Sequence, residues 1–141
     1  MKKALLLLTS LLCTIFPGCR SSEETPPALQ TTGEYHKISA GQAKDIMEST
    51  DGWILLDVRT REEYDEAHID GAVLIPDFEI AARMESEIPD KEVVILVYCR
   101  SGRRSANAAH EILDLGYSHV YDFGGIIDWP YETTVEKENG K

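Results

Sequence analysis

VVILVYCRSGRRS, residues 93–105, is the stretch of this sequence that decides the fold. Its first five residues are aliphatic, a pattern typical of a strand buried on both faces in a parallel sheet. Downstream, Gly116 is placed to end a helix whose apolar face is formed by Ala106, Ala109, Ile112 and Leu113. The stretch is therefore predicted to fold as strand, tight loop and helix, with Cys99 where the loop begins.

The loop after Cys99 is strongly basic and contains Arg100, Ser101, Gly102, Arg103, Arg104 and Ser105. Ligand sites in open α/β sheets lie outside the carboxyl ends of the strands, where a helix N-terminus presents free N–H groups. Such groups and nearby cations lower the pKa of a thiol from its ordinary value of about 8.5, and the thiolate is the nucleophile. We interpret the loop as an anion cradle around the thiolate. The alternative is a buried structural cysteine beside a solvated basic turn.

Other apolar runs predict the rest of the domain. Strands are expected at 36–38, 53–58, 72–75 and 120–122, and helices are expected around 43–47, 62–64 and 78–88. The expected helix N-caps are Ser39, Thr60 and Asp77. Because strands alternate with helices, the pattern favours an α/β fold with a parallel sheet.

Three motifs in order resemble those of the rhodanese family of sulfurtransferases. YCRSGRRS at 98–105 resembles the family's active-site loop. LDVR at 56–59, followed by Glu63-Tyr64, HIDGA at 68–72 and IP at 75–76, resembles its first signature. VYDFGG at 120–125, with Trp129 just after it, resembles its C-terminal signature. The match covers roughly 35–131, and one departure is Ala67, where the family usually has glycine.

The resemblance implies a rhodanese-like α/β domain, with a central, mostly parallel sheet flanked by helices on both faces. It also implies that the Cys99 thiolate takes the outer sulfur of a small anionic donor such as thiosulfate. Sulfite leaves, and the Cys99 persulfide then gives its sulfur to cyanide or a thiol. Residues 100–105 are expected to bind the substrate, and Asp57 and Arg59 to brace the loop as a buried pair. No metal or organic cofactor is required.

The formal net charge of the chain is −11. Non-specific nucleic-acid binders are basic, so this charge excludes that class of protein. Two other functions stay open beside sulfur transfer. One is a cysteine-dependent phosphatase or arsenate reductase, and the other is a non-catalytic sulfur carrier or interaction module. Cysteine phosphatases have an arginine at the sixth position after the cysteine, whereas here that position is Ser105 and Arg104 stands one place earlier.

The N-terminal region is predicted to direct export. Residues 1–18 have a basic start and an apolar run too short to span a membrane, as in a secretory signal peptide. FPGC at 16–19 resembles the lipobox of bacterial lipoproteins, with Cys19 as the lipidated residue; the alternative is ordinary cleavage and a soluble secreted protein.

Residues 19–34 are predicted to be a flexible linker, 35–132 the rhodanese-like domain and 133–141 a polar tail. We therefore expect a membrane-anchored protein facing the periplasm or the cell exterior.

The cysteine count predicts how sulfur leaves the protein. Cys13 falls within the expected signal peptide, so lipidation of Cys19 would leave Cys99 as the only thiol. Without a second thiol to resolve the persulfide, the sulfur must pass to an external acceptor. One such cysteine and scattered histidines give no spacing of metal ligands, so no metal site is expected.

Overall fold

The computed structural model describes residues 33–135. The predicted signal peptide, Cys19, most of the predicted linker and two thirds of the predicted tail lie outside the described residues. Within 33–135, the helices are too short or too polar to cross a lipid bilayer.

Five strands form one sheet in the order β1-β5-β4-β2-β3, and each pair of neighbours is parallel. The strands are β1 (Glu34–Lys37), β2 (Trp53–Asp57), β3 (Val73–Leu74), β4 (Val94–Cys99) and β5 (His119–Gly125). The helices are α1 (Ala40–Ser49), α2 (Arg61–Glu66), α3 (Ile80–Glu87) and α4 (Arg103–Asp114), and two 3-10 turns are η1 (Asp77–Glu79) and η2 (Ile126–Asp128). The predicted α/β fold with a parallel sheet is confirmed.

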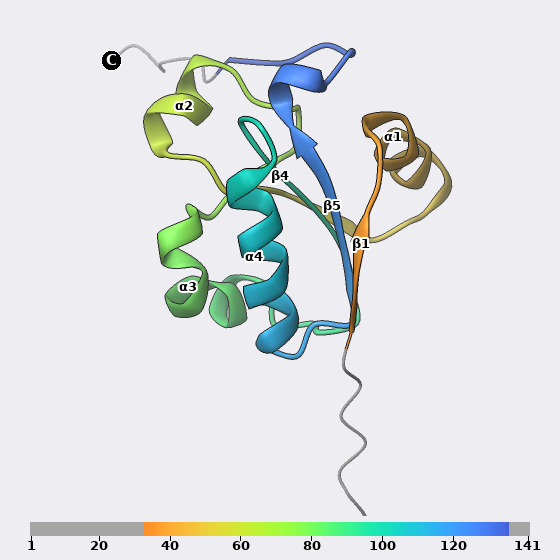
Figure 1. Cartoon of the computed structure of the whole chain (residues 1–141), viewed down its shortest axis with the longest axis vertical. Helices are drawn as coiled ribbons and strands as arrows, with labels where there is room; N and C mark the ends of the chain where they lie inside the picture. The colour runs from red at the N-terminus through yellow and green to blue at the C-terminus, as the bar shows by residue number, and fades with distance from the viewer. Residues whose placement is uncertain (1–32, 136–141) are drawn as a thin grey trace, which may run out of the picture.

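Helices cover the two faces of the sheet unequally. Figure 1 shows α3 and α4 packed on one face, α1 on the other, and α2 near the carboxyl ends of the strands. The first face buries apolar side chains of α3 and α4, including Met84 and Ile112, and the second buries Ala43 of α1. The sheet therefore separates two cores, and its carboxyl edge stays open for a site.

The central strand β4 links both cores, because successive side chains of a strand point to opposite faces. Ile95, Val97 and Cys99 belong to the core under α3 and α4, whereas Leu96 and Tyr98 belong to the core under α1. The prediction of a strand buried on both faces is confirmed. The alternation also directs the Cys99 side chain to the α4 side of the sheet.

Two of the three predicted N-caps are correct. Ser39 and Thr60 each accept a hydrogen bond from the backbone N–H three residues on, and each forms a reciprocal capping box. The cap predicted at Asp77 is wrong. The Asp77 backbone N–H donates to the carbonyl of Val58, the residue directly after β2, at 3.0 Å, and Asp77 begins η1. The α-helix starts only at Ile80, without a side-chain cap.

Candidate active site

Cys99 is the last residue of β4 and lies at the carboxyl edge of the sheet, where it is only 1% exposed. The chain turns back at once through residues 100–102 and enters α4 at Arg103. The backbone N–H of Gly102 donates to Cys99 Sγ at 3.1 Å. The predicted strand, tight loop and helix are therefore confirmed, and the loop closes over the sulfur.

Gly102 makes this closure possible. It occupies the N-cap position of α4 with a φ of +97°, in the left-handed region that glycine adopts without steric cost. The position provides no side-chain cap, so the first N–H groups of the helix stay available to an acceptor in the loop. The Cys99 sulfur is such an acceptor, and the Ser105 N–H in the first turn of α4 is one of its donors.

The loop favours the thiolate. Burial raises the pKa of Cys99, but hydrogen bonds from the Ser105 backbone and side chain and from the Gly102 and Ser101 backbone outweigh it. The pKa of the thiol is therefore lowered below its ordinary value. The predicted direction of the shift agrees with the structure, and backbone N–H groups and a serine provide these stabilising hydrogen bonds.

The three loop arginines have different environments. Arg100 and Arg103 are exposed, whereas Arg104 extends to α2 and makes two hydrogen bonds of 2.7 Å to the Glu63 carboxylate. This bidentate pair is the main reason why the pKa of Glu63 is lowered to about 2. Arg104 therefore joins the first turn of α4, directly after the loop, to α2. A role of the arginines in donor binding stays a prediction.

A buried carboxylate, for which no role was predicted from the sequence, supports the loop from beneath. Asp122 of β5 is fully buried and accepts hydrogen bonds from Ser105 Oγ at 2.7 Å and from Lys37 Nζ at 2.8 Å. Tyr35 Oη and the Gly124 N–H are its other donors. Burial raises the pKa of Asp122, but these donors outweigh it and leave the pKa below its ordinary value. Lys37 and Asp122 are partners in the β1–β5 register, so strand pairing was the signal that could have found them.

The predicted buried pair of Asp57 and Arg59 is confirmed. Arg59 Nη2 lies 2.6 Å from Asp57 Oδ2 and also donates to the Ala67 carbonyl at 2.7 Å. Its guanidinium group stacks 5.6 Å from the centre of the Tyr98 ring, on the residue before Cys99. The pair thus joins the ends of β2 and β4 and braces the strand from which the loop departs.

The last support of the loop is close packing of its backbone on the backbone at the end of β5. A Cβ atom at Gly125 would lie 2.3 Å from the Arg100 carbonyl oxygen and 2.6 Å from Ser101 Cα. The Ile127 N–H also donates to that carbonyl, at 3.3 Å. Gly125, the second glycine of the VYDFGG motif, therefore brings β5 into contact with the loop.

The family model named rhodanese-like domain matches residues 39–130 of this chain. The chain belongs to the rhodanese-like family. Thiosulfate sulfurtransferase PspE of Escherichia coli (strain K12) is 41% identical over 76 residues, which cover 54% of this chain and 71% of PspE. A protein named Sulfurtransferase from Allochromatium vinosum is 38% identical over 96 residues, which cover 67% of this chain and 87% of that protein. A solved structure described as rhodanese with anions from E. coli matches with a TM-score of 0.55 at 35% identity, covering 58% of this chain and 96% of that one.

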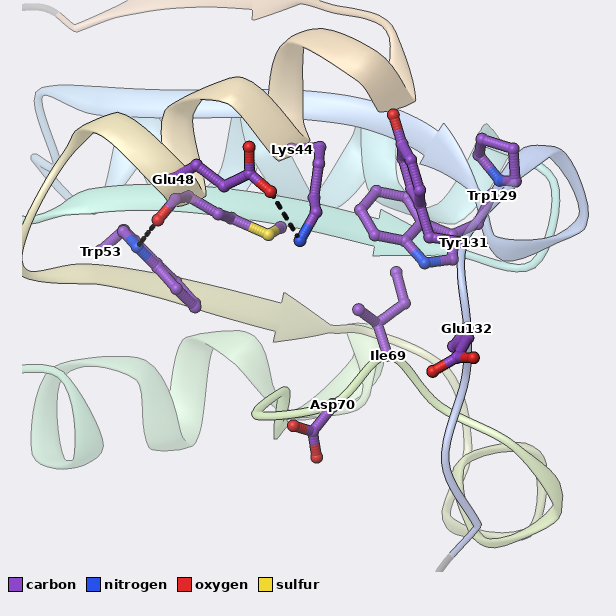
Figure 2. Close-up of a pocket in the computed structure, with 10 residues that line it drawn as sticks. Lys44, Glu48, Trp53, Ile69, Asp70, Trp129, Tyr131 and Glu132 are labelled. Carbon is purple, nitrogen blue, oxygen red and sulfur yellow. Dashed lines mark hydrogen bonds and ion pairs between the residues drawn. The ribbon is translucent and has the colours of Figure 1, made fainter.

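The rhodanese-like domain also has a cavity of about 520 Å³ away from Cys99. Figure 2 shows it between α1 and the segments around Ile69 and Tyr131, with Trp53 and Trp129 in its lining. These residues belong to the α1 side, whereas the Cys99 side chain points to the α4 side. The sheet therefore separates this cavity from the sulfur. Within the described residues, no cluster of His, Cys, Asp and Glu side chains is suited to a metal ion.

Lys37→Met is expected to raise the pKa of Cys99 and to slow its alkylation at neutral pH roughly two- to fivefold. Without the ammonium group of Lys37, Asp122 holds the hydroxyl proton of Ser105 more tightly. The negative charge of Asp122, which lies beneath the loop, is then also less compensated. The rate of alkylation by iodoacetamide between pH 5 and 10 measures the effect. Lys44→Met is the matched control, because Lys44 is ion-paired with Glu48 on the opposite face. Identical pH profiles for wild type and Lys37→Met would contradict the expectation.

Proposed function

We propose that this rhodanese-like protein is a sulfurtransferase that moves sulfane sulfur from thiosulfate or a similar donor, through a persulfide on Cys99, to cyanide or a thiol. The observation that carries the proposal is the contact between the Gly102 N–H and Cys99 Sγ in a loop that lowers the thiol pKa. The family membership and the similarity to the thiosulfate sulfurtransferase PspE support the same chemistry.

The first half-reaction loads the enzyme. The Cys99 thiolate attacks the outer sulfur of thiosulfate and forms a new S–S bond. The bond between that sulfur and the sulfonate sulfur breaks, and its electron pair leaves with sulfite. The outer sulfur of the persulfide then carries the negative charge, which the inward N–H groups of the loop stabilise as an oxyanion hole would.

The second half-reaction discharges the enzyme. Cyanide or a thiolate attacks the outer sulfur, and the electron pair of the breaking S–S bond returns to Cys99 as the thiolate. Among the described residues Cys99 is the only cysteine, so the acceptor must come from outside this domain. The two half-reactions together restore the starting thiolate without a net oxidation of the protein.

Intact-mass measurement before and after thiosulfate tests the proposal. We expect a gain of one sulfur atom that cyanide removes as thiocyanate. Steady turnover of thiosulfate and cyanide then distinguishes an enzyme from a sulfur carrier. A carrier would load one sulfur atom and keep it until its partner protein binds. No gain in mass at any thiosulfate concentration would refute the proposal.

Phosphatase activity is expected to be negligible beside sulfur transfer. The side chain at the sixth position after the nucleophile is Ser105, which is buried and bound to Asp122, and Arg104 is bound to Glu63. The loop therefore lacks the guanidinium group that would grip two phosphate oxygens at that position. Parallel assays of thiosulfate:cyanide transfer and aryl phosphate hydrolysis measure the ratio. Cys99-dependent phosphatase turnover without sulfur transfer would reverse this assignment.

We further propose that the protein is exported and anchored through a lipid on Cys19, with residues 1–18 as its signal peptide and residues 19–34 as the linker to the membrane. The support is the sequence pattern alone, a basic start, an apolar run and FPGC. Detergent partitioning of wild type against Cys19→Ala tests the anchor. Wild type recovered wholly in the aqueous phase would contradict it.

A further inference from the structure

The cavity of about 520 Å³ on the α1 side of the sheet has three aromatic side chains in its lining, Trp53, Trp129 and Tyr131, and we name it the aromatic cavity. Figure 2 shows Trp53 at one end of it and Trp129 with Tyr131 at the other. Pockets for small molecules usually measure about 300–1,000 Å³ and are lined mostly by apolar side chains. The size and the lining of the aromatic cavity therefore fit a small molecule.

The aromatic walls are held in place by contacts within the domain. Trp53 Nε1 donates to the Met47 carbonyl at 3.0 Å. The Trp129 ring packs on Phe123 with 5.4 Å between the ring centres, and it meets Tyr131 edge to face at 4.8 Å. The faces of such rings attract cations. The cavity therefore has preformed walls of the kind that bind a positively charged group.

The charges in the lining are mainly negative. Its one ammonium group, on Lys44, is paired with Glu48 at 3.1 Å and lies 5.9 Å from the centre of the Tyr131 ring. Asp70 and Glu132 also line the cavity and are exposed, and within residues 33–135 no hydrogen bond or ion pair engages either carboxylate. Figure 2 shows both on the side of the cavity opposite α1. The lining therefore has two uncompensated negative charges.

Trp129 also carries a buried hydrogen-bond donor without an acceptor. The residue is 9% exposed, and its Nε1 atom is buried and has no acceptor among the described residues. Buried indole N–H groups usually have a partner. Figure 2 shows this nitrogen on the ring edge toward Ile69 and Glu132, two other residues of the lining. A ligand with an acceptor on that side would provide the missing partner.

We infer that the aromatic cavity is a second ligand site, which binds a small organic cation: an ammonium group on an apolar body that carries a hydrogen-bond acceptor. The ammonium group pairs with Asp70 and Glu132, and the body lies between Trp53 and Trp129. The acceptor receives the Trp129 indole N–H. An anionic ligand fits less well, because the one ammonium group of the lining is already paired.

The test uses the intrinsic fluorescence of the protein. The chain has two tryptophans, and both line the aromatic cavity, so their emission reports directly on its occupancy. The probes are 2-phenoxyethylamine, 2-phenoxyethanol and phenoxyacetate, which share a ring and an ether oxygen but are cationic, neutral and anionic. We expect a saturable change with the amine at millimolar concentration. The neutral and anionic probes should bind at least roughly fivefold more weakly.

Three variants test the assigned charges. Asp70→Asn and Glu132→Gln should each weaken binding of the amine roughly two- to fivefold, as expected for one exposed ion pair, and leave 2-phenoxyethanol unchanged. Lys44→Met should strengthen binding of the amine, because it removes a positive charge and releases Glu48. Asp114→Asn is the matched control, because this exposed residue ends α4 on the opposite face of the sheet.

Three outcomes of the titrations would overturn the inference. One is the absence of a saturable change with the amine, and another is equal affinity for the three probes. The third is tightest binding of phenoxyacetate with loss of that binding in Lys44→Met, which would make the cavity an anion site. An Asp114→Asn effect as large as that of Asp70→Asn would likewise exclude a specific ion pair.

A second measurement observes the Trp129 N–H itself. The two indole N–H groups give separate NMR resonances, which Trp53→Phe assigns. With the amine bound, the Trp129 resonance should move downfield as it gains an acceptor, whereas Trp53 keeps its Met47 acceptor and should move less. A fluorescence change without a shift of the Trp129 resonance would contradict the inference. Neither readout needs sulfur on Cys99, so this inference and the proposed function succeed or fail separately.

Discussion

Cys99→Ser is expected to abolish sulfur transfer, with a loss of at least roughly 10³-fold. A serine hydroxyl is scarcely ionised at neutral pH, and the hydrogen bonds that favour the Cys99 thiolate cannot overcome that difference. The exchange is nearly isosteric at a site that is 1% exposed, and the serine oxygen can accept the Gly102 N–H in place of sulfur. The fold should therefore survive the loss of the nucleophile.

Two measurements separate chemistry from folding in this variant. Thiocyanate production from thiosulfate and cyanide reports the transfer rate, and thermal unfolding reports stability. We expect the first to vanish and the unfolding midpoint to stay within a few degrees of wild type. Transfer by the serine variant near the wild-type rate would rule out Cys99 as the sulfur carrier.

Gly125→Ala is expected to lower sulfur transfer roughly a hundredfold and to destabilise the fold by about 1–3 kcal/mol. The new methyl group would lie 2.3 Å from the Arg100 carbonyl oxygen and 2.6 Å from Ser101 Cα. Both contacts are with backbone, so no side-chain rotation relieves them, and the loop must move. A displacement of about 1 Å separates the loop N–H groups from the sulfur that they stabilise.

Gly41→Ala provides the control for Gly125→Ala. Gly41 lies in α1, and a Cβ there has no neighbour closer than 3.8 Å. Alanine is the better helix former, so this variant should keep full activity and gain up to about 1 kcal/mol of stability. Activity, denaturant unfolding and the pH profile of Cys99 alkylation are compared in both variants. Wild-type activity in Gly125→Ala would show that the loop does not depend on its close contact with β5.

The local order of residues was sufficient to predict the framework of the site. The aliphatic run before Cys99 forms a strand buried on both faces, and the loop and helix follow where the glycine and the apolar periodicity indicated. The Ser39 and Thr60 caps and the Asp57–Arg59 pair were predictable for the same reason. The two caps and the Asp57–Arg59 pair each join residues two or three apart, so the chain brings these partners together without help from the rest of the fold.

Tertiary structure decided what surrounds the sulfur. Glu63 and Arg104 are 41 residues apart, and Lys37 and Asp122 are 85 apart, so only the packing of α2 and the pairing of β1 with β5 bring them together. The sequence predicted three arginines around a thiolate, whereas in the fold Arg104 is paired with Glu63 and Arg100 and Arg103 are exposed. The family and the fold could be predicted from the sequence, and Cys99 could be proposed as the nucleophile, because these features depend on local pattern and order. The supports of the loop depend on contacts between distant segments, which exist only once the sheet has formed.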